Sequence, residues 1–344
     1  MDGYFKDTNM KPGLIKFIIA LSLVCSFNLF ANAYTPKDND VIAVTKSNIT
    51  ASLSLSEIKT AVEQSQFVGQ TENMQGVLKN KLSKLYISEP TPDIGYLYAR
   101  VLQKEHLFND AITVANNVLK IMPDHSNTHL LLANLYMTQG QFELAKQHCL
   151  ALITRVSTLT ASTCVLDVQS QHGNLLGSYQ SLVKLANKKP IDLNTKHVLA
   201  EMSFRLQNYT NALKHLENIS LVNAPVSLIV LWADIQLGLN KPQQVINKLS
   251  NLIKEPHDLE DALLLRLAIA EKQLNMTQYT WQNTMKQRVE LREVRHDSFH
   301  ASDLANYYIH VQPNKSKALY WANINWQQAK MNIDQALIIQ AKRM

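Results

Sequence analysis

Residues 130–145 read LLLANLYMTQGQFELA, and this stretch decides the fold. It carries two alanines 12 positions apart, Ala133 and Ala145, with a glycine between them. A second pair with the same internal spacing, Ala99 and Ala111, lies 34 residues earlier. Two helices approach closely only where short side chains lie at their contact, and a strict 34-residue period with two such positions is typical of stacked helix–turn–helix pairs. The stretch therefore predicts an all-α array of repeats.

The same period continues beyond the first two units. Ala200 and Ala212 lie 67 residues after the alanines of the opening stretch, which is one unit of 34 plus one of 33, and Pro190 follows Pro123 by the same interval. This phase predicts a helical repeat array over 54–344 after an extended lead-in at 34–53. We expect the helix pairs and the final capping helix at 56–90, 92–123, 126–157, 159–190, 193–224, 226–256, 259–294, 298–330 and 333–344.

The order of residues within a unit resembles the tetratricopeptide repeat (TPR). The residues that carry this resemblance are a small residue, an aromatic residue three later, a turn glycine and a second small residue, best seen in Ala133, Tyr136, Gly140 and Ala145. Other units depart from the pattern, with Leu166, Ser178 and Val245 in place of alanines. The resemblance implies a right-handed α-solenoid of about seven to eight helix pairs with a C-terminal capping helix.

The C-terminal part is similar to a narrower group, the exported bacterial TPR proteins of unassigned function. Trp281, the pattern Arg295-x-Asp297-x-x-His300 and the pair Asn325-Trp326 carry this similarity. It implies an exported protein and transfers no activity.

The N-terminus has the three parts of a secretory signal peptide. Lys11 and Lys16 precede an apolar run at 17–30, and residues 31–33 read Ala-Asn-Ala, a small-residue cleavage pattern. The alternative is a membrane anchor, but about 14 apolar residues are too few to cross a bilayer core of about 30 Å. We therefore expect a signal peptide at 1–33, cleavage before Tyr34 and a periplasmic mature protein that spans no membrane.

Cys149 and Cys164 remain after this cleavage. In repeat phase Cys149 lies in the second helix of one unit and Cys164 in the first helix of the next, and these helices are antiparallel neighbours. An oxidising compartment favours a bond between them, which would close a loop of about 15 residues and stabilise the fold by about 3 kcal/mol. The alternative is two buried free thiols.

No motif of catalysis, cofactor binding or a structural metal site occurs in the sequence. Removal of 1–33 leaves 31 basic and 26 acidic residues, and such a mild basic excess does not indicate a nucleic-acid partner. The histidines come closest to a site. His296 and His300, with Asp297 and Asp303, could lie on one helix and bind a metal, which gives a metal-binding accessory protein as an alternative function.

The first helices of a TPR array line its concave surface, and the ninth position of each unit points into this groove. That position reads Arg100, Asn134, Asp167, Glu201 and Asp234. Three consecutive acids favour a basic partner by their local field, although a solvated face is the alternative. The predicted partner-binding residues are Tyr96, Arg100, Asn134, Asp167, His197, Glu201, Arg205 and Asp234.

These features predict a non-catalytic periplasmic scaffold that binds an envelope protein or peptide in its concave groove. A rival reading is a structural protein that stabilises an envelope assembly through its convex or terminal faces.

Overall fold

The computed structural model describes residues 53–71, 74–187, 190–252 and 259–344. The predicted signal peptide and the predicted lead-in up to residue 52 lie outside this part of the chain. Within it the regular elements are helices, with no strand. The prediction of an all-α fold is confirmed.

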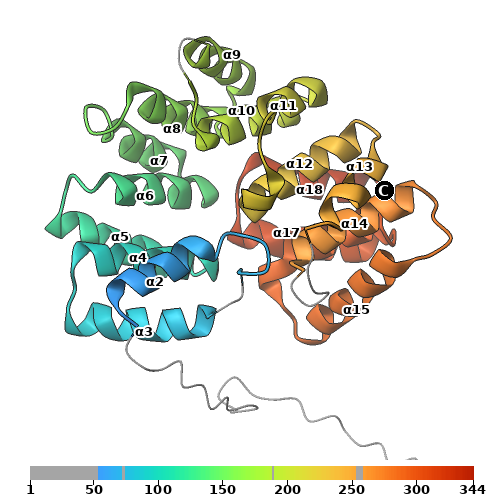
Figure 1. The fold of residues 1–344 in the computed structure, drawn as a ribbon, viewed down its shortest axis with the longest axis horizontal. Helices are drawn as coiled ribbons and strands as arrows, with labels where there is room; N and C mark the ends of the chain where they lie inside the picture. Colours follow the sequence, from blue (N-terminus) through green and yellow to red (C-terminus); the bar gives the residue numbers. More distant parts are fainter. Residues whose placement is uncertain (1–52, 72–73, 188–189, 253–258) are drawn as a thin grey trace, which may run out of the picture. The chain divides into compact units, whose positions relative to one another are not determined.

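The helices form eight consecutive pairs and one final helix in the described residues (Figure 1). Their bounds are α2 Leu55–Gln64, α3 Gln75–Ser88, α4 Pro92–Lys104, α5 Phe108–Ile121, α6 Ser126–Thr138, α7 Phe142–Leu150, α8 Thr158–Gln171, α9 Leu175–Ala186, α10 Leu193–Arg205, α11 Tyr209–His215, α12 Val226–Gly238, α13 Pro242–Leu249, α14 Asp261–Gln273, α15 Thr280–Val294, α16 Ala301–His310, α17 Lys315–Gln328 and α18 Asn332–Arg343. From α4 onward the second helix of each pair packs against the first, and successive pairs stack along a curved array.

The alanines that set the period lie at the helix contacts. Ala99, Ala111, Ala145 and Ala200 are fully buried. Because their side chains are short, the backbones of paired helices come close together. Gly95 shows how close this approach is, since a Cβ added there would lie 2.5 Å from a side-chain carbon of α5. The sequence signal therefore reports the packing that holds each pair together.

A residue with a positive φ angle lies in the turn between the two helices of a pair, and it recurs with the same period. Positive φ angles occur at His106 (57°), Gly140 (72°), Gly173 (104°), Gln207 (59°) and Asn240 (56°), at intervals of 34, 33, 34 and 33 residues. One residue in this conformation ends a helix and reverses the chain. Glycine adopts it without strain, whereas the other three residues adopt it at a cost. The same turn geometry therefore recurs along the array, although the type of residue at this position varies.

The C-terminal helices return to the inner side of the curve, where red α17 and α18 face the green middle pairs (Figure 1). The connection between them, residues 328–332, is hereafter the closing segment. It crosses the ends of α6 and α8: the Lys330 amide donates to the Thr138 carbonyl over 2.7 Å, and the Asn332 side chain donates to the Gln171 carbonyl over 2.8 Å. These contacts join residues far apart in the chain.

A second junction joins the first pair to the later ones. The Val226 amide donates to the Gln66 carbonyl over 2.9 Å, and the Gly69 amide donates to the Glu260 carboxylate over 2.8 Å. The turn between α2 and α3 therefore packs against the starts of α12 and α14. No helix in the described part of the chain is long and apolar enough to cross a membrane.

Candidate functional site

Polar side chains on neighbouring first helices pair with one another across the array. Gln103 of α4 donates to Asn134 of α6 over 2.7 Å. Two helices further along, Gln171 of α8 donates to Glu201 of α10 over 3.1 Å. Two of the predicted partner-binding residues, Asn134 and Glu201, thus take part in hydrogen bonds between neighbouring first helices. The accessibility of the predicted residues differs sharply along the array.

The open surface consists of Tyr96, Arg100, Gln103 and Asn134, on α4 and α6. Asn134 is exposed and the other three are half-buried. The Arg100 guanidinium lies 6.0 Å from the Tyr96 ring centre, and that ring packs on His125 at 5.4 Å. An aromatic ring, a guanidinium and two side-chain amides therefore lie together. Such groups bind main-chain and polar side-chain atoms of a peptide.

The closed surface consists of Asp167, Glu201, Arg205 and Asp234, on α8, α10 and α12. The Asp234 carboxylate accepts two hydrogen bonds of 2.9 Å from Arg266. Burial opposes the charge on Arg266, but Asp234 and Asp303 raise its pKa above the ordinary value. The negative charge of Asp234 is therefore neutralised by an arginine of the next pair.

Arg205 lies behind the row of acids. Its side chain is only 8% exposed and lies 3.8 Å from Glu201. It donates to the Ser170 hydroxyl over 2.8 Å and to the Ser170 carbonyl over 2.7 Å. Burial lowers the pKa of Arg205 from its ordinary value, while Glu201 and Asp167 oppose that shift. The same burial lowers the pKa of His197 on α10, against the effect of Glu201.

Asp167 is held largely in its neutral form. Burial raises its pKa to about 8, Glu201 adds to this shift and Arg205 opposes it. Part of the residue is reached by solvent, but its Oδ1 atom is enclosed and has no hydrogen-bond partner in the described structure. The three acids thus present little free negative charge, because two are paired with arginines and one is protonated near pH 7. The expectation of a basic partner, which rested on free charge at these positions, stays a prediction.

A cavity of about 670 Å³ lies beside the closed surface. Arg205, Asp234 and Arg266 line one side, and Asn332 and Ile333 at the start of α18 line the other. The chain's own C-terminal helix therefore forms part of the boundary of the cavity next to the closed surface.

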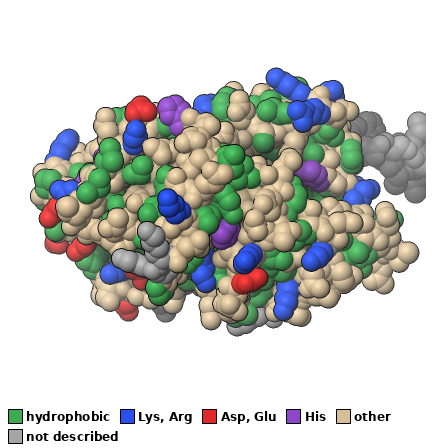
Figure 2. All heavy atoms as spheres, turned by 90° about the horizontal axis from the view of Figure 1, so that it is seen from above, with side chains coloured by type: hydrophobic (Ala, Val, Ile, Leu, Met, Phe, Trp, Pro, Cys, Tyr) green, Lys and Arg blue, Asp and Glu red, His purple; other side chains and the backbone are tan. Residues whose placement is uncertain are grey.

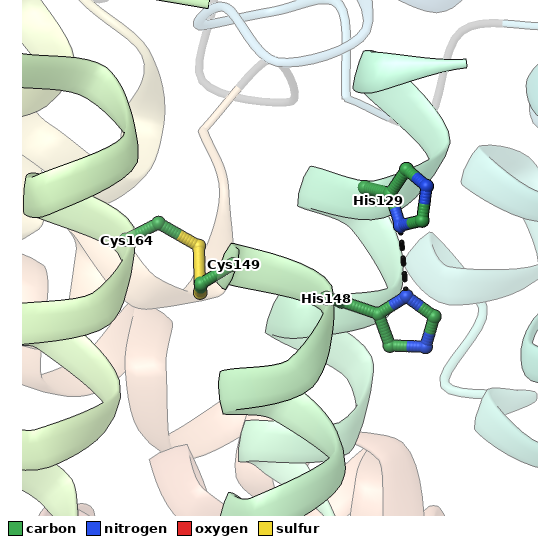
Figure 3. The surroundings of a disulfide bond; sticks show 4 residues. All are labelled: His129, His148, Cys149 and Cys164. Carbon is green, nitrogen blue, oxygen red and sulfur yellow. Dashed lines mark hydrogen bonds between the residues drawn. A yellow bond between two sulfur atoms is a disulfide. The ribbon is translucent and has the colours of Figure 1, made fainter. Parts of the chain in front are cut away.

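The sulfur atoms of Cys149 on α7 and Cys164 on α8 lie at bonding distance, 1.99 Å, with their Cα atoms 5.5 Å apart (Figure 3). This Cα separation is one that a disulfide spans without backbone movement. The predicted pairing of these helices as neighbours is therefore compatible with the bond. Cys149 is fully buried.

Two histidines face each other beside these cysteines (Figure 3). The Nδ1 atoms of His129 and His148 lie 3.0 Å apart, and His129 Nε2 lies 2.9 Å from the Pro123 carbonyl. Since a carbonyl only accepts, His129 Nε2 donates, and in the neutral pair its Nδ1 accepts from His148. Burial and His129 lower the pKa of His148 to about 4. His148 is therefore neutral near pH 7, and its contact with His129 joins α7 to α6.

The predicted metal-binding helix is wrong in its geometry. Helix α15 ends at Val294, His296 has a φ of 50°, and Asp297 caps a separate short turn. His300 Nδ1 is taken by Asp297 at 3.0 Å, and Asp297 also accepts from Arg292 over 2.5 Å. No group of three or more His, Cys, Asp or Glu residues suited to a metal occurs in the described part of the chain. The metal-binding alternative therefore has no structural support.

Sequence reasoning missed the residues that contact the closing segment: Thr138, Gln139, Ser170 and Gln171. The sequence feature that could have identified them is the last position of each first helix. This thirteenth residue of successive units reads Lys104, Thr138, Gln171 and Arg205. In the structure each of these residues makes a contact outside its own helix.

The outer side of the array offers a different kind of surface. Figure 2 shows a face on which apolar, basic and uncharged side chains are mixed and acidic ones are sparse. On α9, Leu176 is 56% exposed and Leu185 is 39% exposed. Scattered apolar residues of this kind are ordinary on a protein surface, so we do not take them as a site.

Three solved structures are similar to this chain. A chain of the APC/C hetero-tetramer Cut9-Hcn1 is 16% identical, with a TM-score of 0.48, and the match covers 83% of this chain and 55% of that one. A tetratricopeptide repeat protein from Parabacteroides merdae ATCC 43184 is 12% identical, with a TM-score of 0.38 and coverage of 84% and 98%. The TPR domain of P58(IPK) is 8% identical, with a TM-score of 0.26 and coverage of 84% and 97%. No curated protein matches the sequence.

Residues 93–154 match the family model for the tetratricopeptide repeat. The match begins in α4 and extends just past α7, so it covers the two pairs that contain the opening alanines. The later helices, from α8 to α17, pair in the same way. The resemblance stated from the sequence is therefore confirmed over residues 93–154, which are similar to the tetratricopeptide repeat.

Proposed function

We propose that this protein is a non-catalytic scaffold that is exported to the periplasm and binds an envelope protein or peptide. A TPR array acts by presenting an extended concave surface for protein binding. The observation that carries the proposal is the open surface, where exposed Asn134 lies with Arg100, Gln103 and Tyr96 on two adjacent first helices. These groups are preorganised by the array, so a peptide docks with little ordering of the protein.

The proposed location rests on the signal peptide and the two cysteines. Export predicts a mature N-terminus at Tyr34 in the periplasmic fraction and a disulfide between Cys149 and Cys164. Sequencing of the mature N-terminus and thiol alkylation with and without reductant test both points. A full-length cytoplasmic protein in which Cys149 and Cys164 are free thiols would contradict the location.

A photo-crosslinking residue at position 134, in living cells, tests the scaffold itself. Capture of one dominant partner, lost when Arg100 and Gln103 are changed to alanine, is the expected result. The matched control is the same residue at position 176 on α9, which is also exposed but lies on the outer side. Capture from position 176 and not from 134 would favour the structural rival, in which the convex face binds.

A further inference from the structure

The closing segment lies across the first helices as a bound peptide would. The backbone after α17 is extended at Ala329, with φ −130° and ψ 135°. The Lys330 amide donates to the Thr138 carbonyl over 2.7 Å, and the Gln328 carbonyl accepts from Gln139 over 2.7 Å. Main-chain hydrogen bonds to an extended segment supply affinity without regard to sequence.

The Met331 side chain supplies an apolar anchor. It packs between α6, α7 and α8, and Thr138 Oγ1 lies 3.9 Å from its sulfur. We call the place that Met331 occupies on this apolar cluster the Met331 pocket. The buried residues of the cluster are Ala133, Met137, Ala145, Cys149 and Val168, and Tyr136, Phe142, Cys164 and Val165 also pack against it. An unbranched, flexible thioether adapts to such an irregular apolar site.

Asn332 supplies a polar anchor beside this pocket. Its side-chain amide donates to the carbonyls of Gln171 and Ser170, over 2.8 and 3.4 Å, and its backbone amide donates to Gln171 Oε1 over 3.1 Å. Gln171 is 4% exposed and donates in turn to Glu201. The asparagine side-chain amide has two N–H donors, which here serve the two carbonyls.

The fit at Gly140 is close. The nearest atom to a Cβ added at Gly140 is the Lys330 Cβ, at 2.9 Å. Gly140 therefore leaves room for the residue that precedes the methionine. The Met331 pocket, the two carbonyls that Asn332 contacts and the space beside Gly140 together fit one short extended sequence.

We propose that the Met331 pocket is a peptide-binding subsite of the groove, that its external ligand is an extended segment with a methionine-like side chain followed by asparagine, and that the closing segment occupies it in cis. This rests on the proposed function, because it names the partner class for the same groove. An attached segment is present at a high effective concentration, so an external peptide binds the intact protein weakly.

The test uses a fluorescent peptide of residues 325–336, NWQQAKMNIDQA, and its binding to three forms of the full mature chain. Met331→Asp places a charge in the apolar pocket and releases the closing segment. Ile339→Asp is the matched control, since Ile339 lies on α18 and is 41% exposed. Fluorescence polarisation is expected to show at least about tenfold tighter binding to Met331→Asp than to the other two forms. A peptide with aspartate in place of its methionine should bind none of them.

Equal affinity for all three forms, or equal binding of the substituted peptide, would overturn the proposal. If Met331→Asp loses helical circular dichroism, Asn332→Ala decides, because it removes the side-chain bonds without adding a charge; a gain in peptide affinity is again expected. No gain in a folded Asn332→Ala chain also refutes the proposal. Crosslinking at position 134 is independent of this outcome, so a captured partner with no peptide binding would leave the scaffold function standing and make the pocket purely structural.

Discussion

The open and closed surfaces use the same repeat positions and differ in what surrounds them. Asn134 and Asp167 both occupy the ninth position of a unit, yet Asn134 is exposed whereas Asp167 has an enclosed oxygen and a pKa of about 8. The repeat sets the direction in which a side chain points. Its accessibility depends on what surrounds it, which for Asp167 includes Glu201 and Arg205 on α10. A groove residue in a solenoid is therefore identified by its neighbours in space as well as by its position.

The largest expected difference between the two surfaces concerns their arginines. Arg266→Met leaves Asp234 and Asp303 without their cation in a buried setting, and breaking such a pair costs about 3–5 kcal/mol. Arg100→Met on the open surface should change the free energy of unfolding by no more than about 0.5 kcal/mol. Denaturant unfolding of both variants checks this. Similar losses in the two variants would mean that the surfaces do not differ in this way.

The disulfide joins α7 to α8, between the open and the closed surface. Cys164→Ser should lower the free energy of unfolding of the oxidised protein by about 3 kcal/mol, because a closed loop of about 15 residues restricts the unfolded chain. Thermal unfolding with and without reductant measures this, and reduced wild-type protein is the control that should match the variant. An oxidised wild-type protein no more stable than Cys164→Ser would contradict the bond.

A comparison of substitutions at two glycines measures how much contact with the closing segment affects stability. Gly140→Ala and Gly173→Ala both place a side chain at positive φ, a strain of about 1 kcal/mol that they share. A Cβ at 140 also meets Lys330, whereas a Cβ at 173 meets nothing within 4 Å. We expect Gly140→Ala to be less stable than Gly173→Ala by about 1 kcal/mol. Equal stabilities would show that the closing segment shifts at no cost.

The smallest expected effect is a dependence on pH at the closed surface. Burial raises the pKa of Asp167 to about 8 in the folded chain, so its contribution to stability is complete below about pH 4 and is lost as the pH rises to 8. Asp167→Asn, which copies the residue at position 134, removes this titration. Solvent reaches part of Asp167, so we expect only a fraction of the free energy that this shift implies at about 1.4 kcal/mol per pKa unit. The variant should exceed the wild type in stability at pH 8 by on the order of 1 kcal/mol and lose that advantage near pH 5. Parallel pH profiles for the two proteins would contradict the raised pKa.

The sequence predicted the elements that repeat and missed those that do not. Ala99, Ala133 and Ala200 recur with the period because every pair needs a close helix contact, so the array was visible from spacing alone. Arg266 does not stand at the ninth position of its unit, which is why its pairing with Asp234 was not anticipated. The acids were therefore interpreted as free charges.

The contacts of the closing segment could not be predicted from the sequence, for a different reason. Its contacts depend on one methionine and one asparagine that belong to no repeat, and they reach residues up to 193 positions away. No periodic pattern encodes such a contact. The C-terminal helix packs on α16 and α17, the last pair of the stack, and its start also lies beside the ends of α6 and α8.

The reach of the closing segment has a consequence for the order in which the chain folds. Each helix pair is built from contacts within a few dozen residues, and local contacts form quickly. Joining Lys330 to Thr138 closes a loop of nearly 200 residues, whose entropic cost is met only after the intervening pairs are in place. We therefore expect the helix pairs to form and stack first, and the closing segment to dock onto α6 and α8 last. Amide protons along the closing segment should then exchange with solvent sooner than those in the buried helix pairs.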